Sequence, residues 1–272
     1  MLLYAYVKLV FPVKRLIILL LFIVAGVLFY FWRSNANISI EPEPVVYPTN
    51  SEIVIPSPLA DLVQYKGKGY AIASFKVSDF GGLKFVGNYE KRLSASSIVE
   101  DYGCKQAISG GFYGEDYRPI GLYIEDGTVR SDWKDNPTFN GVLWIGRNTF
   151  EAGVSRKLPD KEILYAIQSG PMLIENEVTL TLRINEDEEA RRSVVISSDN
   201  GLLYFLSIYD PKSVYIGPFL SDLPSIIQIY GKEKNINIET AINLDGGSAS
   251  FYHDGETTLS ELVTVGGIIC LQ

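Results

Sequence analysis

One carboxylate near the C-terminus stands in a pattern that apolar packing does not require. Asp245 directly precedes Gly246, Gly247 and Ser248. Glycines leave room for close approach, and consecutive backbone N–H groups can form a nest for an anion. We therefore interpret Asp245 as a catalytic base or nucleophile that substrate must approach closely, and the three residues after it as substrate contacts. A tight hairpin turn is the structural alternative.

Three further stretches interrupt strand-like runs with glycine, proline or arginine. They are 108–127, 167–177 and 191–198. A guanidinium binds phosphate through a two-pronged hydrogen bond, so Arg192 is the candidate phosphate ligand, with Arg191 as the alternative. Pairing of an arginine with Glu188 or Glu189 is the structural reading. The candidate substrate contacts in the other stretches are Ser109, Gly110, Gly111, Asp116, Ser169 and Gly170.

Other kinds of site are not indicated by local pattern. The sequence has no cysteine pair, no histidine cluster and no Asp-x-Asp calcium loop, so we expect no metal and no cofactor. His253, the only histidine, stands in a segment typical of a hairpin tip. A Gly-x-Ser-x-Gly elbow is also missing, which disfavours a Ser-His-Asp hydrolase.

The elements that must position these residues are mostly strands. Asp126-Gly127 and Asn200-Gly201 lie between apolar runs and predict hairpins. Residues 69–77 and 82–87 resemble a pair of strands, and 202–208 is nearly continuously apolar, which predicts a strand buried on both faces.

Two helices are predicted. One begins at a Ser94 or Ser96 cap and ends at Gly103; the other has Asp222 as its cap, Pro224 in its first turn and Gly231 as its end. The fold class is α+β, a strand-rich domain with a mixed or antiparallel sheet and a few flanking helices.

The N-terminal region differs from the rest of the chain. Residues 16–32 are uncharged and mostly apolar, and as a helix they would span about 25 Å. Basic residues precede them, so we expect residues 1–33 to be a cytoplasmic stub and a transmembrane helix, with the rest extracytoplasmic. Cleavage of residues 1–36 as a signal peptide, giving a secreted protein, is the alternative. Prolines in 34–58 predict an extended linker to a domain at 59–272.

Charge and cysteine content limit the partners and the compartment. Four of the 24 basic residues and none of the 32 acidic residues precede Ser34, so the remainder carries a net charge of about −12. Such a surface repels nucleic acid. Cys104 and Cys270 are the only cysteines. Outside the cytoplasm they can pair, but two buried free thiols are equally compatible with the sequence.

Taken in order, the motifs resemble those of the phosphodiester glycosidase domain family, over roughly residues 65–272. The resemblance rests on Gly110-Gly111-Phe112-Tyr113, Pro119-Ile120-Gly121-Leu122, Gly170-Pro171-Met172-Leu173, the strand from Arg192, and Leu244 to Ser248. The family has Asn where this chain has Ser109 and an aromatic pair of the Phe-Phe kind at 112–113. A serine keeps one hydrogen-bonding oxygen but lacks the geometry of an amide, so we expect substrate choice or activity to differ.

The resemblance implies a hydrolase that releases a sugar from a sugar-1-phosphodiester, with Asp245 central. The expected substrate is a phosphorylated glycan of the envelope or a secreted polymer. The alternative is a non-catalytic glycan-binding or exopolysaccharide-assembly module with the same pocket, and a third possibility is an interaction scaffold. The sugar, the anomeric outcome and the oligomeric state are left open.

Overall fold

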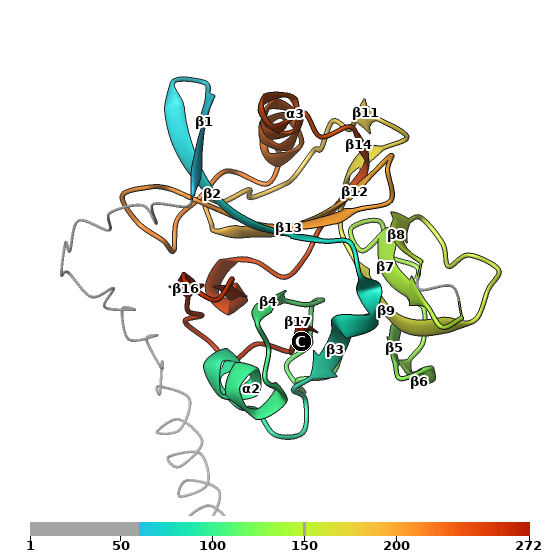
Figure 1. Ribbon diagram of the computed structural model, residues 1–272. Coiled ribbons are helices and arrows are strands. Elements are labelled where there is room, and N and C mark those ends of the chain that lie inside the picture. The colour runs from blue at the N-terminus through green and yellow to red at the C-terminus, as the bar shows by residue number, and fades with distance from the viewer. Residues whose placement is uncertain (1–59, 149–150) are drawn as a thin grey trace, which may run out of the picture. The chain divides into compact units, whose positions relative to one another are not determined.

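The computed structural model describes residues 60–148 and 151–272 (Figure 1). The expected membrane anchor and linker lie outside these ranges. Among the residues that are described, no helix is long and apolar enough to cross a membrane.

The largest sheet has seven strands, each antiparallel to its neighbours. In spatial order they are β1 (Asp61–Tyr65), β2 (Lys68–Val77), β13 (Leu203–Tyr209), β12 (Arg192–Ser198), β14 (Ile238–Asn243), β10 (Met172–Glu175) and β11 (Val178–Thr179). The helix α3 (Leu223–Lys234) covers one face of this sheet (Figure 1).

Two five-stranded antiparallel sheets complete the described domain. The β4 sheet contains β16 (Thr258–Leu259), β15 (Tyr252–His253), β4 (Gln106–Ser109), β17 (Gly267–Leu271) and β3 (Leu83–Gly87). The β9 sheet contains β6 (Thr128–Ser131), β5 (Tyr123–Glu125), β9 (Ile163–Ser169), β7 (Gly141–Gly146) and β8 (Ala152–Ser155). Short 3-10 turns occupy Phe80–Gly82 and Gly247–Ala249.

One apolar core joins the three sheets. It contains Phe75 of the seven-stranded sheet, Phe85 of the β4 sheet and Leu143 of the β9 sheet, all buried. The helix α2 (Ala95–Tyr102) packs separately on the β4 sheet through Ile98. The prediction of a strand-rich domain with few helices is thus confirmed, and the strand pairs of the described residues are antiparallel.

The helix ends test the capping predictions. Ser94 caps α2 by accepting a hydrogen bond from Ser97 N–H, and Gly103 ends it in the left-handed conformation, as predicted. The prediction for α3 was wrong at its C-terminus, because the helix continues through Gly231 to Lys234. Gly231 serves packing there, since a Cβ at this position would lie 2.6 Å from Ile238 Cδ1.

The hairpins at Asp126-Gly127 and Asn200-Gly201 are confirmed as the β5–β6 and β12–β13 turns. The predicted pairing of 69–77 with 82–87 was wrong. Instead, β2 pairs with β1 and β13, whereas β3 pairs with β17 of another sheet. The 3-10 turn at Phe80–Gly82 separates the two strands. β2 pairs with its neighbour in sequence, β1, and with the distant β13, whereas β3 pairs with the distant β17.

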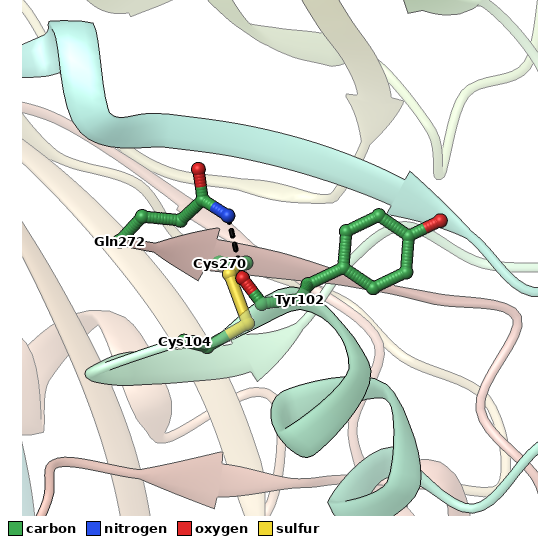
Figure 2. Close-up of a disulfide and its surroundings, with 4 residues drawn as sticks. All are labelled: Tyr102, Cys104, Cys270 and Gln272. Atoms are coloured by element: carbon green, nitrogen blue, oxygen red, sulfur yellow. Dashed lines mark hydrogen bonds between the residues drawn. A yellow bond between two sulfur atoms is a disulfide. The ribbon is translucent and has the colours of Figure 1, made fainter.

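Cys104 and Cys270 form a disulfide, with Cα atoms 5.4 Å apart (Figure 2). Cys104 follows α2 and Cys270 lies in β17, so the bond ties the helix to the β4 sheet. Gln272 Nε2 donates to the carbonyl of Tyr102 beside it (Figure 2). The sequence left a disulfide and two free thiols open, and the structure shows the disulfide.

Candidate active site

Asp245 lies where the chain passes from the seven-stranded sheet to the β4 sheet. Leu244 N–H donates to Ser193 O (2.8 Å) and Gly247 N–H donates to Arg191 O (2.8 Å). The acceptors are two residues apart and the donors three, so one extra residue bulges out of the ladder around Asp245. The N–H of Asp245 donates instead to Gly110 O (2.9 Å), at the end of β4. The bulge thus places this aspartate at the junction of two sheets.

The carboxyl group of Asp245 is buried, with 8% of the residue exposed. Burial raises its pKa from 3.8 to about 7, and a hydrogen bond from Gly246 N–H acts in the opposite direction. A carboxyl group that titrates near neutrality can accept or release a proton under physiological conditions.

The two glycines after Asp245 are needed by the fold itself. A Cβ on Gly246 would lie 2.9 Å from Arg191 O, and Gly247 has a left-handed φ of 60°. Their N–H groups are also in use, since Gly246 donates to the Asp245 carboxylate and Gly247 to Arg191 O. Both glycines therefore have a structural role of their own, and their contact with substrate stays a prediction, as does that of Ser248, which is exposed.

Ser109 supports the backbone of Asp245. Its hydroxyl donates to Asp245 O (2.7 Å) and lies 2.9 Å from Ser193 Oγ. Ser193 Oγ is 3.0 Å from Ser250 Oγ, which accepts a hydrogen bond from Arg191 Nε (3.0 Å). All five residues are buried. A chain of hydroxyl groups therefore links Arg191 to the site.

The two arginines point to opposite faces of the chain entering β12. Arg191 lies on the side of Ser193 and Ser250, is completely buried, and donates to the carbonyls of Ser250 and Ser260. Burial lowers the pKa of Arg191 to about 10.

Arg192 is directed toward the preceding loop and the segment before α3. It donates to Pro218 O (3.0 Å) and Glu188 O, and its guanidinium lies 3.7 Å from the Asp187 carboxylate. Burial lowers its pKa, which Asp187 and Glu188 partly offset. The expected pairing with a Glu188 or Glu189 carboxylate is thus replaced by an ion pair with Asp187 and a bond to the backbone of Glu188. The phosphate-binding role of Arg192 stays a prediction.

Tyr113 is a neighbour of Asp245 that sequence reasoning did not select. Burial, together with the negative charge of Asp245, raises the pKa of Tyr113 to about 12, so the phenol stays protonated. Its hydroxyl donates to Thr264 O. The sequence did offer one signal for it. The family pattern has phenylalanine at this position, and Tyr113 adds a hydroxyl group.

A small cavity of about 20 Å³ lies beside the junction, with room for about one water molecule. Its lining includes Gly110, Gly111, Phe112, Tyr113, Ile120 and Gly267. A Cβ on Gly111 would lie 2.4 Å from Ile167 Cγ2, so this glycine lets β9 pack closely against the end of β4. The cavity is mainly apolar.

The other predicted contacts hold or flank the strand that leads to Asp245. Ser169 Oγ and Gly170 N–H both donate to Asn243 O, at 2.7 and 3.1 Å. Asn243 Nδ2 returns a hydrogen bond to Gly170 O (3.0 Å). Asp116 instead lies in an exposed turn, where its carboxylate accepts from Arg118 N–H. Within the described ranges, no three His, Cys, Asp or Glu side chains are grouped so as to hold a metal ion.

A larger groove of about 460 Å³ lies elsewhere, between β8 and the seven-stranded sheet. Arg156 and Glu175 form a two-pronged ion pair at this groove, with both distances 2.7 Å. None of the predicted site residues lines it. The groove is therefore separate from the Asp245 site.

The fold and the site together define a strand-rich domain with a buried carboxylate at the junction of its antiparallel sheets. Sequence comparison matches the phosphodiester glycosidase family over residues 102–262, more than half of the chain. The chain belongs to the phosphodiester glycosidase family, and this membership supports a glycosidase-type function.

Individual relatives are more distant. The chain is 30% identical over 169 residues to "Uncharacterized protein YigE" of Escherichia coli (strain K12), a match that spans 56% of this chain and 59% of that protein. It shares its fold with the catalytic domain of zebrafish N-acetylglucosamine-1-phosphodiester alpha-N-acetylglucosaminidase, with a TM-score of 0.60 and 14% identity over 78% of this chain and 81% of that one. A hypothetical protein from Synechocystis is similar at a TM-score of 0.54 and 14% identity, over 78% of this chain and 61% of that one.

Proposed function

We propose that this protein is an exported, membrane-anchored glycosidase that hydrolyses a sugar-1-phosphodiester bond on an envelope or secreted glycan. Asp245 is its central residue. The observation that carries the proposal is a buried carboxyl group, with its pKa raised to about 7, held at the sheet junction of a phosphodiester glycosidase domain. The zebrafish relative is named for a reaction of this type.

In the proposed reaction, the oxygen of water becomes bonded to the anomeric carbon and the bond from that carbon to the phosphate oxygen breaks. The products are a free sugar and a phosphate monoester, with one proton released. The departing phosphate is a stabilised anion, so the reaction needs less general-acid assistance than hydrolysis of an ordinary glycoside. The ionised Asp245 carboxylate either takes the proton from water or attacks the anomeric carbon directly.

The test uses the full-length chain and its Asp245→Asn variant with a panel of sugar-1-phosphodiesters. The control is Asp199→Asn, an exposed carboxylate in the β12–β13 hairpin that accepts a hydrogen bond from Asn237 Nδ2. We expect free sugar and phosphate monoester from the parent and the control, and a loss of at least about a thousandfold in kcat/KM for Asp245→Asn. Turnover retained by Asp245→Asn would exclude this role for the residue.

The same role predicts the pH dependence. Because Asp245 acts in its ionised form and its pKa lies at about 7, kcat/KM should rise with pH up to about 7 and then level off. A rate that falls with pH across this range would instead indicate that the protonated carboxyl group acts as an acid.

One observation favours the second candidate, a glycan-binding module without turnover. Ser109, at the position of the family asparagine, is 1% exposed and its hydroxyl already contacts Asp245 O and Ser193 Oγ. It is therefore not free to orient a sugar. Binding of the panel by the parent without any product would support this candidate.

A further inference from the structure

The loop between β16 and β17, residues 260–266, borders the Asp245 site at two points. Leu262 N–H and Val263 N–H both donate to Ser248 O, at 2.7 and 3.1 Å. On the other side, Tyr113, whose pKa responds to the charge of Asp245, donates its hydroxyl hydrogen bond to Thr264 O. The tip of this loop is therefore part of the rim of the candidate active site.

The backbone of the loop is held on both sides of this tip. Ser260 O accepts a hydrogen bond from Arg191 Nη2 (2.6 Å), and the Glu261 carboxylate accepts from Ala95 N–H (2.7 Å). Asn88 Nδ2 donates to Val265 O (2.8 Å), and Asn88 N–H donates to Gly266 O (2.9 Å). These bonds fix the position of the tip and use polar groups of the loop within the chain itself.

Two neighbouring aliphatic side chains at this tip are partly exposed to solvent. Leu262 and Val263 are each 46% exposed. Exposed apolar surface is unfavourable in water, so an apolar group that covers this adjacent pair gains binding free energy. Val129 of β6 is a similarly exposed aliphatic residue that lies in another sheet.

We propose that Leu262 and Val263 form a subsite for an alkyl aglycone, so that the substrate is a sugar-1-phosphodiester of a lipid alcohol. This inference rests on the proposed function. The proposal places the group beyond the phosphate against this tip, because the tip N–H groups donate to Ser248 O, three residues after Asp245. A hydroxylated aglycone would need hydrogen-bond partners, whereas the backbone groups of this loop named above are already paired. Hydrolysis breaks the anomeric carbon–oxygen bond and releases free sugar and an alkyl phosphate.

The test compares methyl, octyl and hexosyl phosphodiesters of one sugar, using full-length protein in nanodiscs. Each methylene removed from water gives about a fourfold gain in affinity, so three covered methylenes give about a fiftyfold higher kcat/KM for octyl than for methyl. The double variant Leu262→Ser/Val263→Ser should reduce this ratio to below about fivefold. The control Val129→Ser should retain the fiftyfold ratio. Because both variants are assayed in the same discs, partitioning of the octyl compound into the discs affects them equally and cannot explain a difference between them.

Equal rates with methyl and octyl substrates, or a preference for the hexosyl compound, would overturn the alkyl subsite while leaving the proposed function intact. A preference for octyl that appears only above its micelle concentration would indicate surface binding and would also overturn it. Absence of turnover with all three substrates counts against the proposed function.

The subsite is then judged by calorimetry with octyl phosphate and methyl phosphate. Tighter binding of octyl phosphate, lost in the double variant, supports it, and equal binding overturns it. If the double variant does not fold, the comparison of the two phosphates with the parent protein decides.

Discussion

The ionisation state of Asp245 makes the free energy of unfolding depend on pH. Its pKa in the folded protein is about 7, above its ordinary value of 3.8, so the folded state binds the proton more tightly than the unfolded state. The contribution of this group to stability is fully present below about pH 4 and is lost as pH rises through 7. The loss amounts to about 4 kcal/mol at high pH.

Asp245→Asn should therefore stabilise the protein more at pH 8 than at pH 5, by about 2–3 kcal/mol, because asparagine has no proton to lose. Urea unfolding of parent and variant at the two pH values measures this difference. Asp199→Asn, at an exposed carboxylate, is the control and should show no such gain. An equal effect of Asp245→Asn at both pH values would mean that the carboxyl group is not desolvated in the folded state.

The two glycines of the bulge should respond differently to substitution. Gly246→Ala places a Cβ against Arg191 O and should cost about 1–3 kcal/mol in the free energy of unfolding. At Gly247 the space is open and the constraint is its left-handed φ, which asparagine tolerates. Gly247→Asn should therefore cost less than about 1 kcal/mol, whereas Gly246→Asn should be as harmful as Gly246→Ala. Unfolding midpoints in urea test this order, and reversed costs would refute it.

At the scale of elements, strand ends position the site, and one disulfide fastens α2 to the sheet beside it. The bulge after β14 moves Asp245 from one sheet to the next, and the end of β4 receives its N–H. The disulfide joins Cys104, just after α2, to Cys270 of the β4 sheet, and these cysteines are 166 residues apart. A disulfide that closes so long a loop strongly reduces the conformational entropy of the unfolded chain.

Replacement of both cysteines, Cys104→Ala/Cys270→Ala, should lower the free energy of unfolding by about 2–5 kcal/mol, because the unfolded chain gains conformational freedom. A reducing agent should lower the thermal midpoint of the parent and leave that of the double variant unchanged. If the parent midpoint does not respond to reduction, the bond does not contribute to its stability in solution.

For the whole molecule, the three sheets depend on one another because they share one core. Phe75, Phe85 and Leu143 come from different sheets and belong to the same buried cluster. Chains of this size often unfold through intermediates, but a shared core opposes separate unfolding of any one sheet.

We therefore expect a single cooperative transition. Trp133 and Trp144 both pack in the apolar cluster of the β9 sheet, so tryptophan fluorescence reports that sheet in a Trp32→Phe background. Its urea midpoint should coincide with that of far-ultraviolet circular dichroism, which reports all strands. An earlier fluorescence transition would show that the β9 sheet unfolds on its own.

Local patterns in the sequence were sufficient for the features that depend on near neighbours. The helix that ends at Gly103, the turns at Asp126-Gly127 and Asn200-Gly201, and the family to which the chain belongs follow from adjacent residues and ordered motifs. Asp245 was selected in the same way, from its place before two glycines. These features are readable because backbone conformation and short motifs are encoded locally. For the cap of that helix the sequence left Ser94 and Ser96 open, and the structure selects Ser94.

Tertiary structure decided what depends on residues far apart. It separated β2 from β3, paired the cysteines, directed the two arginines to opposite sides and brought Tyr113 to Asp245. Burial of Asp245, and thus its raised pKa, arises only when the seven-stranded sheet and the β4 sheet meet at this residue. Desolvation and strand partners are properties of the assembled fold, so no stretch of sequence carries them alone.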